Sequence, residues 1–170
     1  WGGDGYSSLG QEVINYVTEL GALIIAAAGN ANTNANFYPA SYTNVLSVAS
    51  TDQSDKKSSF SNYGDWVDVS SPGSNIYSTW FNDTYATLNG TSMATPLVCG
   101  LAALTNAIFP DYIPSQISEQ IRINCDDIYG SNATYNYQLG KGRINAFKTL
   151  SNTNSKAVRA YEIVLSDAQG

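Results

Sequence analysis

Hydrophobic residues recur three and four positions apart along residues 8–20, and this spacing is typical of an amphipathic helix. Gly21 follows directly, at a position where helices commonly end. Residues 23–28 then form a short, wholly apolar run, which is typical of a strand buried on both faces of a parallel sheet. A helix that leads across a glycine into such a strand predicts part of a β-α-β arrangement.

The same patterns predict further elements downstream. Residues 45–49 predict a second buried strand, and residues 66–69, 75–79 and 85–88 predict short strands separated by Ser71-Pro72-Gly73 and Asn82-Asp83. Residues 94–109 carry the longest helical pattern, which Pro110 ends, and residues 115–123 predict another helix with Pro114 in its first turn. A last short helix is expected within residues 140–150. Together these elements predict an α/β fold of three layers, with a mostly parallel sheet between helices.

The composition changes near the end of the chain. After Ser151 it becomes rich in Ser, Asn and Thr, as in a linker, and residues 158–165 then alternate as in a strand. We therefore expect residues 1–150 to belong to one domain. Residues 151–170 are interpreted as a linker that could lead into the first strand of an accessory module.

Composition narrows the classes of function. The chain has 170 residues, 43% of them hydrophobic and 13% charged, which is typical of a globular protein with one core. Its net charge of −6 and the absence of any Lys/Arg cluster argue against nucleic acid as a partner. No run reaches the roughly 18 apolar residues of a membrane span. The abundance of Asn, Ser, Thr and Tyr suggests a secreted or cell-surface protein, and a start at Trp1-Gly2-Gly3 without Met suggests a piece of a longer one.

Two cysteines, Cys99 and Cys125, leave two interpretations open. The favoured one is a pair of small buried hydrophobic residues, because free cysteine is among the most buried residue types. The other is a disulfide between two helices, which would indicate an oxidising compartment. Metal binding by the pair is disfavoured, because the chain has no histidine and no Cys-x-x-Cys spacing.

Candidate chemistry centres on Ser92, in the stretch "NGTSMATP" that precedes the longest helical pattern. A serine at such a place most often caps the helix by accepting a backbone hydrogen bond. Here Gly90 also allows close approach of another backbone, and a helix N-terminus offers N–H groups to an anion formed beside Ser92. A hydroxyl in that position is well placed to attack a carbonyl group.

A second candidate is Asn30, in the stretch "AAAGN" at the carboxyl end of a predicted strand. Ligand sites in parallel α/β sheets lie at such ends. The small residues Ala27, Ala28 and Gly29 would leave a wall against which a substrate could lie, and Asn30 could direct its amide N–H into the site. The alternative is a simple turn formed by the Gly-Asn pair.

The stretches "AAAGN", "SPGSNIYST" and "NGTSMATP", in this order and at these separations, resemble the C-terminal half of the subtilisin-like serine peptidases, the subtilases. The resemblance covers residues 1–150, including the run "LGKGRINAFKTL" near its end. It implies that Ser92 is the acylating nucleophile and that Asn30 supplies the oxyanion-hole amide. It further implies three groups of substrate-binding residues. Trp1, Gly2 and Gly3 would pair with the substrate backbone as an added strand. Ala27, Ala28 and Gly29 would form one wall of the S1 pocket, and Phe37 would lie at its base.

The catalytic Asp and His of subtilases both precede the nucleophile in the chain, so the resemblance places both upstream of Trp1. We therefore expect the complete protein to be a secreted serine endopeptidase that acts on peptides or proteins, and this chain to be inactive without the upstream half of the domain. Leu97 stands where the family often has a second histidine, which is not the catalytic base. The resemblance implies no required cofactor. Structural calcium occurs in the family, sometimes at backbone carbonyls after a Tyr-Pro-Ala step, here Tyr38-Pro39-Ala40.

Two alternatives remain. The first is a sedolisin, a related serine peptidase that uses Glu in place of His. The nucleophile motif of sedolisins resembles Gly-Thr-Ser-Ala, and an Asp takes the oxyanion position. This chain instead has Met93 after the serine and Asn30 at the oxyanion position, which favours the subtilisin branch. A non-catalytic binding module derived from a peptidase is the other alternative, although neither Ser92 nor Asn30 is needed for the fold. An α/β-hydrolase is excluded, because it would need a histidine after the serine.

Overall fold

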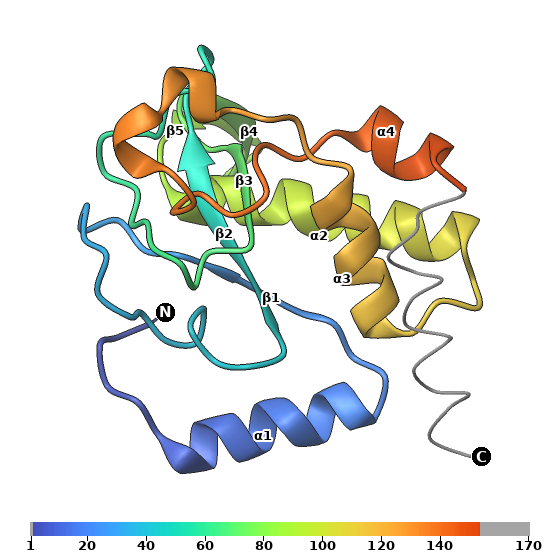
Figure 1. The fold of residues 1–170 in the computed structure, drawn as a ribbon. Coiled ribbons are helices and arrows are strands. Elements are labelled where there is room, and N and C mark those ends of the chain that lie inside the picture. The colour runs from blue at the N-terminus through green and yellow to red at the C-terminus, as the bar shows by residue number, and fades with distance from the viewer. Residues whose placement is uncertain (1, 154–170) are drawn as a thin grey trace, which may run out of the picture.

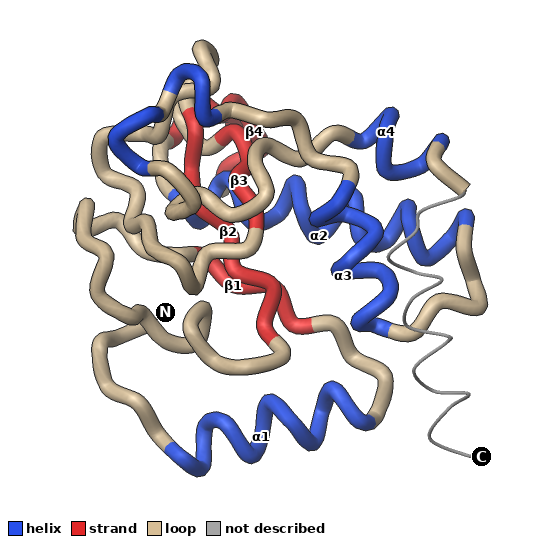
Figure 2. Tube along the Cα trace, in the orientation of Figure 1, coloured by secondary structure: helices blue, strands red, loops and turns tan. Residues whose placement is uncertain are grey.

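A computed structural model describes residues 2–153 of the chain. Figure 1 shows the order of its elements, and Figure 2 shows how much of the chain between them is loop. The helices and strands are α1 (Ser8–Glu19), β1 (Ile24–Ala27), β2 (Val45–Thr51), β3 (Val69–Pro72), β4 (Ile76–Trp80), β5 (Thr84–Leu88), α2 (Thr91–Ile108), α3 (Pro114–Ile123) and α4 (Ala146–Ser151), with short 3-10 helices at Tyr129–Ser131 and Ala133–Tyr135.

The central sheet is parallel, as the buried apolar runs predicted. Its strand order is β1-β2-β3, and β4 and β5 form a separate antiparallel hairpin. Side chains alternate between the faces of a strand, so Leu46 and Val48 of β2 pack with α2 and α3, whereas Val45 packs with Ala26 and with Ile14 of α1. Helices therefore lie on both faces of the sheet, and the α/β prediction is confirmed.

Helix α2 crosses one face of the sheet (Figure 1) and packs against all three of its strands and against α3 and α4. Its residues Ala94, Val98 and Leu101 are buried against Val48 and Val69 of the sheet. By length and composition α2 is apolar enough to cross a membrane, and it is the one such helix within residues 2–153. Because its inner face packs on the sheet, we interpret it as the core helix of a globular fold.

Three elements begin three or more residues from their predicted starts. The strand expected at residues 66–69 begins only at Val69 and continues through Pro72. The helix expected from residue 94 begins at Thr91, because Gly90 in front of it serves as the N-cap. The helix expected within residues 140–150 begins at Ala146.

The reason for the last difference lies beside β3. Arg143 makes a parallel bridge with Ser70 and an antiparallel bridge with Asp126, so this stretch extends the sheet and does not coil. Gly140 and Gly142 have φ values of 71° and 116°, which side chains rarely adopt. A Cβ on either would also overlap a backbone carbonyl, that of Asp68 or of Asp126.

Both cysteines are free thiols, so the disulfide alternative is not formed. Cys99 is exposed on α2, which corrects the expectation that both are buried. Cys125 is largely covered, and burial, with a smaller contribution from Asp126, raises the pKa of its thiol to about 12. The predicted strand at residues 158–165 lies outside the described residues, and the linker is described only as far as residue 153.

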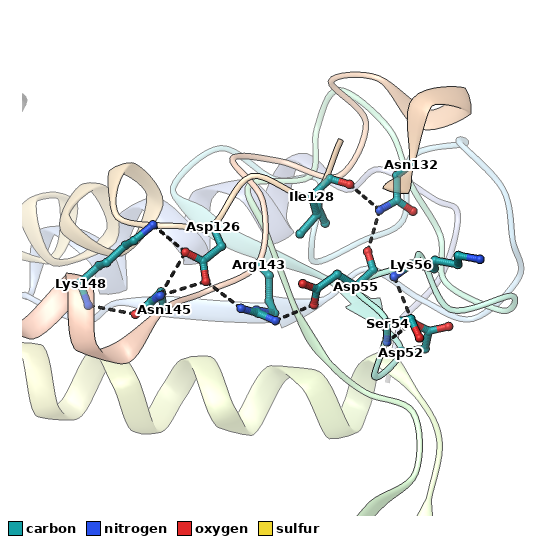
Figure 3. Close-up of polar contacts among 10 residues, drawn as sticks. All are labelled: Asp52, Ser54, Asp55, Lys56, Asp126, Ile128, Asn132, Arg143, Asn145 and Lys148. Carbon is teal, nitrogen blue, oxygen red and sulfur yellow. Dashed lines mark hydrogen bonds and ion pairs between the residues drawn. The ribbon is translucent and has the colours of Figure 1, made fainter. Parts of the chain in front are cut away.

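A polar network ties the C-terminal segment to the loop after β2 (Figure 3). Arg143 forms ion pairs with Asp55 at 2.6 Å and with Asp126 at 2.7 Å. Asp126 also accepts from Lys148 at 2.6 Å and from Asn145 at 2.9 Å. Hydrogen bonds, from Lys148 first and then from Asn145 and Arg143, lower the pKa of Asp126 from 3.8 to about 2.

We therefore expect Asp126→Asn to destabilise the complete protein at pH 5 to 7 by on the order of 1 kcal/mol, allowing for solvent screening of the partly exposed side chains. The folded-state pKa is depressed, so the stabilisation is present above the unfolded-state value near 3.8 and is lost as pH falls toward about 2. Urea unfolding of both proteins between pH 2 and 7 measures this. Asp83→Asn is the control, since Asp83 makes no ion pair within residues 2–153. A difference that stays constant down to pH 2 would contradict the assignment.

Candidate active site

Ser92 is the second residue of α2, and its side chain is exposed. The backbone N–H of Ser92 is one of the first four of the helix, which have no acceptor within it. The N-cap residue Gly90 has no side chain to cap this end, and a side chain bonds only the first N–H, that of Thr91, which donates to Asn30. Ser92 is thus not the N-cap residue, and its hydroxyl stands beside an N–H group that is free to bind an anion.

Asn30 follows β1 and faces the start of α2. Its Oδ1 accepts two hydrogen bonds from Thr91, one from the backbone N–H and one from the hydroxyl, each at 2.9 Å. The hydroxyl of Thr91 in turn accepts from the N–H of Gly29 at 3.2 Å. Because both donors converge on Oδ1, the Nδ2 group of Asn30 is directed away from Thr91, toward the solvent side of the site.

The two free donors, Asn30 Nδ2 and the backbone N–H of Ser92, both lie beside Gly90. An ideal Cβ built on Gly90 would lie 3.5 Å from Asn30 Nδ2 and 3.6 Å from the backbone N of Ser92. Met93 Sδ lies 3.4 Å from the same point, and because residue 90 is glycine, no side chain of that residue separates the two nitrogens. An oxygen placed between the two nitrogens could accept a hydrogen bond from each, which is the geometry that stabilises an oxyanion next to a serine nucleophile.

Phe37 lies between the two segments expected to line the substrate pocket. A Cβ on Gly2 would overlap the Phe37 ring, and a Cβ on Gly29 would lie 3.2 Å from its Cδ1 atom. Gly3 exchanges both backbone hydrogen bonds with Tyr38, at 3.0 and 2.8 Å, which fixes this segment beside Phe37. Trp1 lies outside the described residues.

The expected wall from Ala27 to Gly29 is only partly accessible. Ala28 is fully buried, and its methyl packs with Ala49 and Val67 in the core. This orientation follows from strand alternation, which turns successive side chains to opposite faces. The N–H of Ala28 donates to Val48 and its carbonyl accepts from Asn62, so Ala28 offers the site no accessible group, whereas Ala27 is partly exposed.

Sequence reasoning missed two residues beside Asn30. Thr91 is 1% exposed and orients the Asn30 amide. Its place directly before Ser92 could have marked it as a residue of the site. Asn62 is 0% exposed and hydrogen-bonds the loop that carries Asn30. Its sequence neighbourhood, "FSNYG", looks like an ordinary turn and gave no signal.

The described residues offer no set of carboxylate ligands for calcium. Residues 2–153 contain no group of three or more His, Cys, Asp or Glu side chains that could hold a metal. In the Tyr38-Pro39-Ala40 step, the carbonyl of Tyr38 accepts from Gly3 and that of Pro39 from Tyr42. Two carbonyls of this step are thus already hydrogen-bonded, and no carboxylate group lies ready to complete a calcium site within residues 2–153.

Residues 1–142 match the subtilase family. The chain belongs to the subtilases. It is 49% identical over 140 residues to thermitase from Thermoactinomyces vulgaris, and 41% identical over 136 residues to subtilisin Savinase from Lederbergia lenta. These stretches cover 82% and 80% of this chain, but only 48% and 49% of the relatives.

Solved subtilase structures share the fold. A protease from Pseudoalteromonas arctica matches with a TM-score of 0.81 at 28% identity, over 91% of this chain and 50% of that one. A cold-adapted subtilisin-like serine proteinase matches with a TM-score of 0.71 at 38% identity, over 75% of this chain and 46% of that one. The structure is therefore a partial subtilisin-like fold, and the chain spans about half the length of the curated relatives it matches.

Proposed function

We propose that this chain is the C-terminal portion of a serine endopeptidase that hydrolyses peptide bonds through an acyl-enzyme on Ser92. The observation that carries the proposal is the approach of Asn30 Nδ2 and the Ser92 backbone N to one point beside Gly90. Ser92 Oγ attacks the peptide carbonyl and gives up its proton to a base. The C–N bond then breaks, the amine leaves with that proton, and water cleaves the ester to restore the serine.

The base has to come from outside this chain, which contains no histidine. Two uncovered apolar stripes support a partner segment. Along α2, Leu97, Leu104 and Ile108 are 43%, 53% and 50% exposed. Along α1, four apolar side chains at helical spacing are 53–69% exposed: Leu9, Val13, Tyr16 and Leu20. We propose that the upstream half of the peptidase domain covers these faces and supplies the His and Asp.

The proposal extends to the substrate and the location. Peptides or proteins are the substrate class. The Asn-, Ser- and Thr-rich composition supports secretion. The assigned binding segment includes Trp1, Gly2, Gly3, Ala27 and Gly29, and strand pairing falls mainly to Gly2, because both backbone groups of Gly3 are used by Tyr38. A non-catalytic binding module is the rival proposal, which the following experiment separates from the first.

A fluorophosphonate probe is expected to label Ser92 in the complete protein and not in the 170-residue chain alone. Without a base the hydroxyl of Ser92 is a weak nucleophile. Addition of the separately expressed upstream half should restore labelling to the chain, and Ser92→Ala should abolish it. Circular dichroism checks that the isolated chain is folded. Rapid labelling of the isolated chain, or none in the complete protein, would overturn the proposal.

Phe37→Gly is expected to change the preference for the P1 side chain. The Phe37 ring lies against Gly2 and Gly29, where a large P1 side chain would need space. The complete peptidase should therefore prefer Ala to Phe at P1. The substitution should raise kcat/KM for a P1 Phe substrate by more than about 10-fold, because pocket discrimination is worth 10- to 200-fold for a single methylene.

The P1 Ala substrate should change little in the same variant. Phe81→Gly, a substitution of an exposed phenylalanine in the turn after β4, is the matched control. Equal changes for the two substrates would show that Phe37 does not set the depth of the pocket.

A further inference from the structure

Asn62 lies directly under the loop that carries Asn30, and its side chain is 0% exposed. Its Nδ2 donates to the carbonyl of Ala28 at 2.8 Å. Its Oδ1 accepts from the N–H of Ala31 at 2.9 Å and from that of Thr33 at 3.3 Å. The carboxamide thus bonds the chain on both sides of Asn30.

The backbone of Asn62 also bonds the loop that carries Asn30. Its N–H donates to the carbonyl of Gly29 at 2.9 Å. Gly29 has a φ of 100°, and a Cβ there would lie 2.5 Å from Asn62 Nδ2, so the loop can approach this closely only with glycine. The contacts of Asn62 reach Gly29 and Ala31, the two residues next to Asn30.

Asn62 does not reach the reacting atoms, because it is fully buried and its side-chain oxygen and nitrogen both bond the loop. Its effect has to pass through the position of Asn30. The two proposed donors are Asn30 Nδ2 and the Ser92 backbone N–H, and oxyanion donors act only when they lie about 3 Å from the developing charge. A small shift of residues 28–33 would therefore weaken one donor and leave the other in place.

We propose that Asn62 is a positioning residue that sets Asn30 for oxyanion stabilisation. The proposal rests on the proposed peptidase activity. It predicts that Asn62→Ala lowers kcat of the complete peptidase by up to about 100-fold, the cost of a misplacement near 1 Å. The loss cannot exceed that of Asn30→Ala if it acts only through Asn30.

A double-mutant cycle in the complete peptidase tests this. Asn62→Ala should lower kcat in the parent protein and change it less than about threefold in an Asn30→Ala background, where the donor is already absent. Asn124→Ala is the matched control, because Asn124 is another buried asparagine, 5% exposed, which bonds Gln120 and Asn152 away from the site. Its effect on kcat should be small in both backgrounds. Equal losses from Asn62→Ala in both backgrounds would overturn the positioning role.

Two further measurements keep the test decisive. Asn62→Ser, which retains one acceptor, should lose less kcat than Asn62→Ala. Failure of both variants to fold would mean that Asn62 serves stability alone, against the proposal. Amide hydrogen exchange of Ala31 and Thr33 should quicken in the variants, and unchanged exchange would also count against it. If the parent protein is inactive, while exchange of Ala31 and Thr33 still quickens in the Asn62 variants, the proposed peptidase function fails and the positioning of the loop by Asn62 does not.

Discussion

Ser92→Ala in the complete peptidase is expected to lower kcat by about a millionfold, a magnitude taken from another subtilase. The alanine leaves the fold intact, because Ser92 is exposed at the start of α2 and caps no backbone group there. Both oxyanion donors remain, since one is the backbone N–H of residue 92 itself. What is lost is the covalent step, and hydrolysis then depends on direct attack by water.

The measurement is kcat on a chromogenic peptide, with the unfolding temperature recorded beside it. Ser59→Ala replaces another exposed serine and should leave both quantities unchanged. KM should change little in Ser92→Ala, because the hydroxyl contributes to the chemical step more than to binding. Retention of more than about 1% of kcat would mean that another group is the nucleophile.

Asn30→Ala is the second large effect, with an expected loss of about 100- to 1,000-fold in kcat, again a magnitude taken from a subtilase. Here the substitution removes Nδ2, one of the two proposed donors beside Gly90. It also frees the N–H and hydroxyl of Thr91, which Oδ1 of Asn30 accepts. The loss should appear in kcat with little change in KM, because the charge on the substrate oxygen develops only in the transition state.

Asn30→Asp separates these two consequences. Aspartate keeps an acceptor for Thr91 but removes the donor, so kcat should fall as far as in Asn30→Ala. Asn136→Ala, in an exposed turn, is the control. If Asn30→Asp retained most of the parent kcat, the role of Asn30 would be to orient Thr91 and not to stabilise an oxyanion.

Much of the fold was predictable because its signals are local. The apolar runs at β1 and β2 predicted buried parallel strands, and the helical spacing predicted α1, α2 and α3 with errors of one to three residues. The strands expected at residues 75–79 and 85–88 were found within one residue, as β4 and β5, but their pairing as a hairpin was not predicted. The family resemblance carried by "AAAGN" and "NGTSMATP" was confirmed by the match over residues 1–142.

Other features were not predictable, because long-range contacts decide them. The stretch around Arg143 has no strand pattern, yet it extends the sheet because Ser70 and Asp126 lie on either side of it. Along α1 the apolar spacing predicted one buried face. Ile14 does pack against the sheet, while Leu9 and Leu20 stay 67% and 69% exposed within this chain.

The sequence by itself determined the chemistry available here: a serine at a helix start, an asparagine after a buried strand, and no histidine to act as base. Only the tertiary structure decided their arrangement. Thr91 orients the Asn30 amide from 61 positions away along the chain, and Asn62 holds the loop from 29 to 34 positions away. Such contacts depend on where the backbone brings buried polar groups together, because each must find a hydrogen-bond partner once it leaves water. The spacing of residues along the chain does not predict which distant group will be that partner.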